Sequence, residues 1–223
     1  MRRPLALAAP LALLTALSAP ALATAHVADD QYQVLSARNA SAAFSSHDGC
    51  LETDVFISST DAVFGGRPGP VNKQGLTSLA YLVYDTCQPM EGKHFPIVFG
   101  GQAQNLTPMS STPRLDRAWV TTSFELVDEV SAAPVPVTMT VTWQLVGALS
   151  HDTSHSHVRS VGDGIVNGHD NDLLGDATGS AVVVVDGNAY AFGPSSDAHL
   201  ELIKAHCQKI DSPHQRFDSL SCI

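Results

Sequence analysis

The sequence predicts an all-β protein, a two-sheet antiparallel β-sandwich or jelly roll of about eight to ten short strands with little helix. Three observations lead to this fold class. Apolar residues alternate with polar ones over several segments, Gly and Pro are spread along the whole chain, and no segment repeats another at a fixed period. Many short strands separated by Gly and Pro turns are typical of sandwich domains.

The clearest strand prediction covers residues 135–145. Apolar side chains occupy every second position there, at Val135, Val137, Met139, Val141, Trp143 and Leu145. The stretch 120–126 alternates in the same way, with Val120, Phe124 and Leu126 on one face. Both segments are therefore predicted to be half-buried strands that pair as a hairpin or meander.

Two further segments are apolar on both faces. Residues 79–84 and 181–185 are rich in strand-forming residues, so we expect them near the middle of the packed sheets. Residues 199–206 are the one stretch with a spacing compatible with a helix, and they alternate almost as well. Shorter strands are predicted at 31–36, 51–58, 96–104 and 188–192.

The first 25 residues have the pattern of a cleaved secretory signal peptide. Two arginines precede the uncharged, Leu- and Ala-rich run Pro4–Pro20, and Ala23–Ala25 places small residues where signal peptidase cuts. We therefore expect cleavage before His26, a secreted protein, and a single domain over residues 26–223. The apolar run is shorter than the about 20 residues that span a bilayer, so we expect no membrane span in the mature chain.

The charge balance argues against nucleic acid as a partner. The chain has 22 acidic and 12 basic residues, and two of the basic ones, Arg2 and Arg3, precede the expected cleavage site. The remaining basic residues are scattered singly, whereas a phosphate backbone requires clustered Lys and Arg. The expected partner is an extracellular ligand or surface whose identity the sequence does not specify.

Four cysteines predict two disulfides. None of them forms a Cys-x-x-Cys pair, so a cysteine-ligated metal is disfavoured, and export places the chain in an oxidising compartment. Four cysteines allow three connectivities. Nearest-neighbour pairing favours Cys50–Cys87 and Cys207–Cys222.

Polar chemistry concentrates in the segment 151–176, which holds four of the ten histidines. If His155 and His157 lie on a strand, their side chains leave the same face roughly 7 Å apart. Both could then bind one zinc or copper ion, with His169 folding back as a third ligand. His151 is a further candidate ligand, and the general base or supporting carboxylate would come from Asp152, Asp163 or Asp170.

Two other interpretations of the same segment remain open. The first is that 147–178 forms a long exposed loop whose Ser, His, Asp, Asn and Gly residues serve turn formation. The second is a calcium site, because hard cations prefer oxygen ligands. The candidate oxygens come from Asp163, Asn167, Asp170, Asn171, Asp172 and Asp176, at spacings that do not fit an EF-hand loop.

His26 offers a separate copper site, because the expected cleavage would place its imidazole beside a free amine. This arrangement resembles the copper site of secreted oxygenases that attack polysaccharides, and the resemblance covers this one residue. A mobile tail is the competing interpretation. The two tryptophans could stack on sugars if exposed, but Trp143 shares a face with apolar residues and is expected in the core.

Two hypotheses for function follow. The first is a non-enzymatic extracellular binding or surface-interaction domain whose loops, chiefly 147–178, carry the contacts. The second is a zinc- or copper-dependent extracellular enzyme with a histidine site around 151–169. Convergence of the three imidazoles on a common point distinguishes the second hypothesis from the first.

Overall fold

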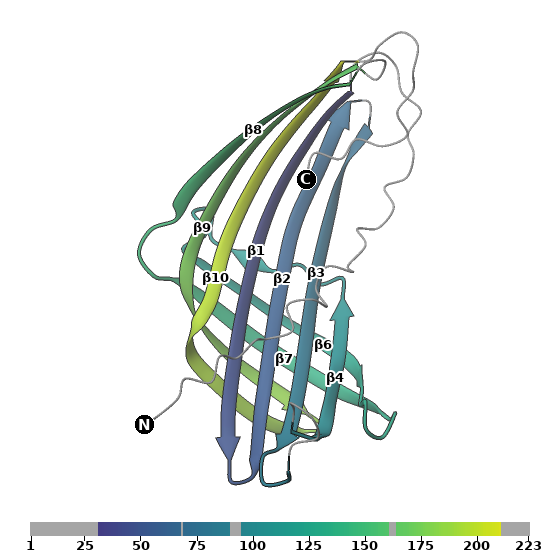
Figure 1. The fold of residues 1–223 in the computed structure, drawn as a ribbon, viewed down its shortest axis with the longest axis vertical. Helices are drawn as coiled ribbons and strands as arrows, with labels where there is room; N and C mark the ends of the chain where they lie inside the picture. Colours follow the sequence, from purple (N-terminus) through teal and green to yellow (C-terminus); the bar gives the residue numbers. More distant parts are fainter. Residues whose placement is uncertain (1–30, 68, 90–94, 161–163, 211–223) are drawn as a thin grey trace.

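The computed structural model describes residues 31–67, 69–89, 95–160 and 164–210, and these form ten strands without a helix (Figure 1). The all-β, antiparallel prediction is confirmed. The strands are β1 (Gln31–Asp48), β2 (Leu51–Arg67), β3 (Gly69–Asp85), β4 (Ile97–Asn105), β5 (Ser110–Ser111), β6 (Arg117–Val127), β7 (Pro134–Leu145), β8 (Ser150–Ser160), β9 (Gly164–Val185) and β10 (Asn188–Ile210). No helix among the described residues is long and apolar enough to cross a membrane.

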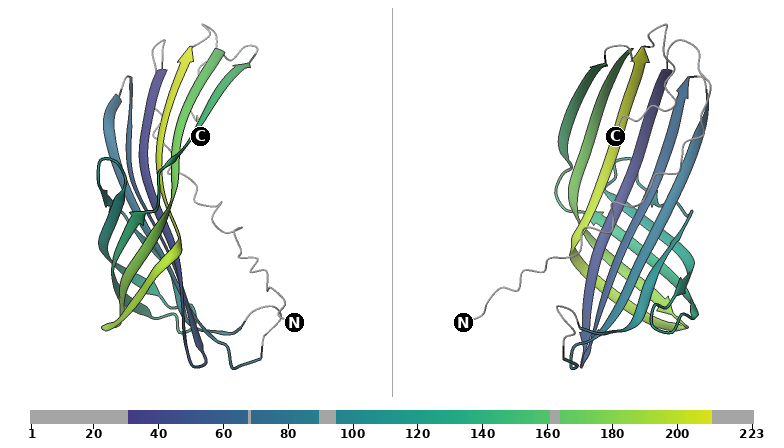
Figure 2. Two further views of the ribbon diagram at one scale, coloured as in Figure 1. Left: turned by 90° about the vertical axis from the view of Figure 1, so that its left-hand side faces the viewer. Right: turned by 45° about the vertical axis from the view of Figure 1, so that its right-hand side comes forward.

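All ten strands belong to one hydrogen-bonded sheet. The strand order is β4-β3-β2-β1-β10-β9-β7-β6-β5. β8 is not in this series and pairs with β9 alone. The sheet bends so strongly that β6 and β7 cross behind β1, β2 and β3 (Figures 1 and 2). Two parts of the sheet thus face each other across the core, an arrangement compatible with the predicted sandwich packing.

The bend brings the edge strand β4 against β6. Gly100 and Gly101 make this approach possible, because a Cβ on Gly101 would lie 2.3 Å from the carbonyl oxygen of Val127. Gly100 has a φ of +144°, and its carbonyl accepts the backbone N–H of Glu129 at 2.7 Å. Any larger residue at position 101 would push the two strands apart.

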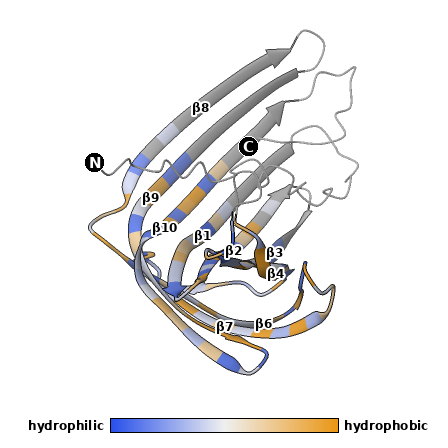
Figure 3. Ribbon diagram, turned by 60° about the horizontal axis from the view of Figure 1, so that its bottom comes forward, coloured by the Kyte–Doolittle hydropathy of each residue, from blue (hydrophilic) through white to orange (hydrophobic). Residues whose placement is uncertain are grey.

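The core lies between the facing parts of the sheet. Every second side chain of β6 and of most of β7 is buried in it. Figure 3 shows hydrophobic and hydrophilic residues alternating along these two strands. Trp143, Val141 and Ile57 are each 0% exposed. The predicted inward faces of 120–126 and 135–145 are therefore confirmed, and so is the burial of Trp143.

Strand β9 changes partners along its length. Its second half pairs with β7 from Ala177 to Val185, and its first half pairs with β8 from Gly164 to Leu174. Strands β8, β9, β10, β1, β2 and β3 consequently extend beyond the closed part of the molecule as one curved layer (Figure 2). This layer carries most of the polar residues singled out from the sequence.

The structure corrects two details of the strand predictions and decides a third that the sequence left open. Several strands are long rather than short, because β1, β2, β3, β9 and β10 contain 17 to 23 residues. Residues 199–206 belong to a strand, since their backbone pairs with both β1 and β9. Val182 is 46% exposed, because none of the described strands packs over the face of β9 opposite the core.

Candidate functional site

The segment predicted as an exposed loop forms two paired strands. β8 and β9 are antiparallel and joined through residues 161–163. The loop interpretation of 147–178 is therefore wrong for 150–160 and 164–178. Pairing on both sides of β9 supplies the backbone hydrogen bonds that hold this polar sequence in strand conformation.

Backbone pairing aligns the histidines of this segment. His155 on β8 lies directly opposite His169 on β9, and His169 lies directly opposite His206 on β10. Residues that oppose each other in antiparallel strands share a face of the sheet, with Cβ atoms about 4.5–5.5 Å apart. His157 is two residues along β8 from His155 and shares that face, where it opposes Asn167.

The other candidate metal ligands are separated from this group. His151 opposes Leu173 and lies four residues from His155, about 13 Å along the strand. His26 and Asp163 lie outside the described residues, so the copper site at the amino terminus stays a prediction. Asp152 and Asp170 lie on the opposite face of the sheet from the aligned histidines. Successive strand residues alternate between the two faces, and each aspartate is an odd number of positions from the aligned histidine on its own strand.

Strand geometry divides the oxygen ligands proposed for calcium. Asn167 and Asn171 lie on the face of β9 that carries His169. Asp170, Asp172 and Asp176 lie on the opposite face, because successive strand residues alternate. Alternation therefore divides these oxygen ligands between the two faces of β9, and the calcium site stays a prediction.

The outer face of the same layer has a shallow groove of about 450 Å³ over β1, β2, β9 and β10. Asn39 donates to a carboxylate oxygen of Glu201 at 2.8 Å, and the hydroxyls of Ser58 and Ser78 are hydrogen-bonded at 2.6 Å. His199 at the groove edge has its Nδ1 atom 3.4 Å from a carboxylate oxygen of Asp176. Residue spacing alone does not predict this polar surface, because its members come from strands far apart in the sequence.

Ser41, His199 and Asp176 lie in one row across β1, β10 and β9, the residue types of a hydrolase triad. In such a triad the second imidazole nitrogen takes the proton of the serine. Here that nitrogen, Nε2 of His199, lies 4.0 Å from a carboxylate oxygen of Asp197. The row therefore has the composition of a triad, but among the described residues no hydrogen bond joins the Ser41 hydroxyl to His199.

A different surface covers the outside of β6, β7 and the second half of β9. Its side chains are mostly hydroxyls, and an exposed indole lies among them. We call it the hydroxyl face; it consists of Trp119, Thr121, Ser123, Thr138, Thr140, Thr142 and Ser180. Trp119 is 39% exposed, while Trp143 is fully buried.

Cross-strand rows organise the hydroxyl face. Trp119 opposes Thr142, which in turn opposes Ser180, and the next row pairs Thr121 with Thr140. The two threonine hydroxyls of that second row are 3.1 Å apart. The guanidinium carbon of Arg117 lies 5.9 Å from the centre of the Trp119 ring, within the range of a cation–π contact. The signal for this face was present in the sequence, because Val120 pointing inward requires Trp119 to point outward.

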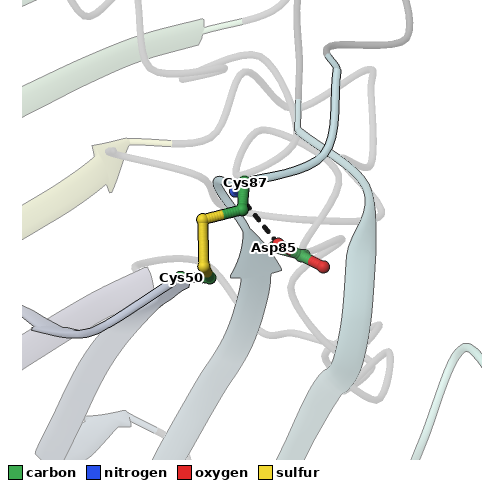
Figure 4. Close-up of side chains that lie close together, drawn as sticks. All are labelled: Cys50, Asp85 and Cys87. Carbon is green, nitrogen blue, oxygen red and sulfur yellow. Dashed lines mark hydrogen bonds between the residues drawn. A yellow bond between two sulfur atoms is a disulfide. The ribbon is translucent and has the colours of Figure 1, made fainter.

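One cluster has the composition of a metal site but cannot act as one. Cys50, Asp85 and Cys87 place potential ligand atoms within 4.8 Å of each other (Figure 4). The two sulfur atoms are bonded to each other at 2.03 Å, so neither is available as a thiolate ligand. Asp85 instead accepts the backbone N–H of Cys87 at 3.0 Å. The predicted Cys50–Cys87 disulfide is confirmed, whereas Cys222 of the second pair lies outside the described residues.

Comparisons with known proteins do not assign the chain to a family. No family model matches it, and no curated protein and no solved structure was found to be similar.

Proposed function

We propose that this protein is a secreted, non-enzymatic binding domain and that it binds neutral glycans through the hydroxyl face. A sugar ring has an apolar C–H face and a rim of hydroxyls. An exposed indole offers the matching flat apolar surface, and threonine and serine hydroxyls both donate and accept hydrogen bonds. The hydroxyl face combines these two elements on a rigid strand framework.

The observation that carries the proposal is the exposure of Trp119 at 39% amid hydroxyl-bearing neighbours. Trp and Arg are enriched among the residues that dominate binding energy at interfaces. Arg117 beside the ring adds a planar donor group. These features favour Trp119 as the anchor of a binding surface.

The charge of the hydroxyl face favours a neutral ligand. Arg117 and Glu125 lie on the outer face of β6 on either side of its hydroxyl-bearing middle. The central rows contain Trp119, Thr121 and Thr140 with their neighbours and no ionisable side chain. The chain as a whole has a formal charge of −10, which disfavours an anionic polymer.

This proposal keeps the predicted class of function and changes the location of its contacts. Loops 147–178 were expected to carry them, but most of that segment is paired strand. A sheet face is more rigid than a loop, so less conformational entropy is lost when it binds. An open sheet face fits an extended polymer better than a small enclosed ligand.

A zinc- or copper-dependent enzyme is the second candidate function. One specific observation favours it, the pairing that places His155 directly opposite His169. An open site with three imidazoles and a water could supply hydrolytic or oxidative chemistry. Such an enzyme would lose its metal and its activity together when either histidine is replaced.

Retention on insoluble neutral polysaccharides tests the proposed function. The secreted protein is mixed with cellulose, chitin and starch, and the bound fraction is compared with that of Trp119→Ala and Leu106→Ala. Leu106 is 75% exposed and lies outside the hydroxyl face, so its variant removes an exposed apolar side chain elsewhere. We expect Trp119→Ala alone to lower retention at least about tenfold. Equal retention of both variants, or no retention of the wild-type protein, would contradict the proposal.

A further inference from the structure

An apolar strip borders the hydroxyl face on the same side of the sheet. Val182 on β9 lies directly opposite Thr140 of β7 and Ala191 of β10, and opposing residues share a face. In the next row Val184 lies opposite Thr138. We call this surface the apolar strip; it consists of Val182, Val184, Ala189 and Ala191. The outer surface therefore changes from hydroxyl-bearing to apolar between β7 and β9.

Two exposed apolar side chains mark the ends of a path across this surface. Trp119 on β6 is 39% exposed, and Val182 on β9 is 46% exposed. The two residues are two strands and one row apart, because Trp119 opposes Thr142 while Val182 opposes Thr140. With about 4.8 Å between neighbouring strands and about 6.7 Å between rows on one face, their Cα atoms are about 12 Å apart. A single sugar ring is too small to stack on Trp119 and contact Val182 at once.

Uncharged hydroxyls lie between these two anchors. Thr140 and Thr142 occupy β7, and Thr121 on β6 forms a row with Thr140. The hydroxyls of Thr121 and Thr140 are 3.1 Å apart. A hydroxyl has one donor and two acceptor positions, so a bonded pair keeps capacity of both kinds for a ligand. The path from Trp119 to Val182 can therefore hydrogen-bond the hydroxyls of a sugar along its middle.

Building on the glycan binding proposed above, we propose that the ligand is an extended β-1,4-linked neutral glycan of the cellulose or chitin type. One ring of the chain stacks on the indole of Trp119. The chain then crosses Thr140, whose hydroxyl bonds the rim of a ring, and a later ring places its C–H face on Val182. The two anchors thus bind different rings of one chain.

The linkage follows from the path between the anchors. Successive rings of a β-1,4-linked chain lie in line, and both faces of each ring present C–H groups, so one chain can reach both anchors. An α-1,4-linked chain coils, which turns later rings away from a sheet surface. A chain that is already extended in solution also loses less conformational entropy when it binds.

This arrangement makes Val182 a residue that determines specificity for ligand length. Trp119 contacts ligands of every length, whereas Val182 contacts only those long enough to cross β7. Once one ring is bound, contact of a second ring with the same surface is intramolecular and adds affinity. The effect of replacing Val182 should therefore grow with the length of the oligosaccharide, and the effect of replacing Trp119 should not depend on length.

Calorimetric titration with soluble oligosaccharides tests the inference. The probes are cellulose and chitin oligomers from the disaccharide to the hexasaccharide, and starch oligomers of the same lengths are compared with them. We expect the wild-type affinity to rise at least about tenfold from disaccharide to hexasaccharide in a β-linked series. Val182→Ser should remove most of this gain and leave disaccharide affinity unchanged, whereas Trp119→Ala should weaken binding at every length. Val98→Ser is the matched control, because Val98 is 38% exposed on β4, outside both surfaces.

The possible outcomes separate this inference from the function on which it rests. Tighter binding of the starch series would overturn the inference and leave glycan binding intact. So would unchanged hexasaccharide affinity in Val182→Ser when Trp119→Ala binds more weakly. Unchanged binding in Trp119→Ala, or no binding by the wild-type protein, would contradict the proposed function and the inference with it. Thermal unfolding shows whether each variant is folded. If Val182→Ser is not, equal wild-type affinity for disaccharide and hexasaccharide would overturn the inference.

Discussion

The carboxylate of Asp128 accepts the backbone N–H of Gly100 at 3.0 Å and so joins the turn after β6 to the edge strand β4. The same carboxylate accepts the hydroxyl of Ser131 at 2.5 Å and its backbone N–H at 3.0 Å. These hydrogen bonds lower the pKa of Asp128 to about 2, and the one from the Ser131 hydroxyl has the largest effect. The charged carboxylate therefore helps to hold the two ends of the bent sheet together.

Stability should depend on the ionisation of Asp128 in acid. The pKa of Asp128 is lower in the folded protein than its ordinary value of 3.8. Its contribution to the free energy of unfolding is therefore fully present above pH 3.8 and is lost as the pH falls towards 2. Asp128→Asn should lower the free energy of unfolding at pH 7 and flatten its pH dependence between these two values. Urea titrations at several pH values measure this. Glu129→Gln, which changes the exposed neighbouring carboxylate, is the control.

The Cys50–Cys87 disulfide should stabilise the protein through its loop. The bond joins residues separated by 37 positions. Closing a loop of this size lowers the conformational entropy of the unfolded chain, which raises the free energy of unfolding by about 3–4 kcal/mol. The double variant Cys50→Ser, Cys87→Ser should lose about this much stability in urea. A loss below about 1 kcal/mol would show that the bond does not constrain the unfolded state as expected.

The two tryptophans should differ sharply in their contribution to folding. Trp143 is completely buried, so Trp143→Ala should cost about 3–5 kcal/mol. Trp119 is 39% exposed, so Trp119→Ala should change the free energy of unfolding by no more than about 1 kcal/mol. Chemical denaturation of both variants measures the difference. A similar loss of free energy of unfolding in both would contradict the assignment of Trp143 to the core and Trp119 to the outer face.

Local alternation explains which parts of the fold were predictable. In β6 and β7 each core residue is flanked by polar ones, so the sequence alone identifies both strand and inward face. The β8–β9 segment has polar residues on both faces, and its strand conformation depends on pairing with distant neighbours. Local patterns cannot predict that kind of stabilisation, which is why 147–178 was expected to form a loop.

The candidate sites show the same distinction. Alternation places Trp119 outward from the position of Val120, so the exposed indole could be inferred before the structure was known. The alignment of His206 with His169 requires the register between β9 and β10, which residue spacing does not determine. The groove beside His199 likewise depends on three strand pairings at once.

Removing hydroxyls from the hydroxyl face should separate binding from stability. Thr121 and Thr140 oppose each other on exposed positions of β6 and β7, and their hydroxyls are 3.1 Å apart. Valine has the same branched shape and a high strand propensity, so Thr121→Val with Thr140→Val should leave the unfolding midpoint unchanged or higher. Retention on the polysaccharide that binds wild-type protein should fall. Unchanged retention would show that these two hydroxyls do not contribute to glycan binding.

The fluorescence of Trp119 tests the proposed binding surface most directly. The chain has two tryptophans, and Trp143→Phe would leave Trp119 as the single indole, with Phe as the least disruptive aromatic substitute in the core. Soluble oligosaccharides of the retained polysaccharide are titrated into this variant, and its emission and its quenching by acrylamide are followed. We predict a saturable blue shift and protection from the quencher, because a bound sugar ring would cover the exposed indole. Binding to the polysaccharide with unchanged emission and quenching would contradict the central claim.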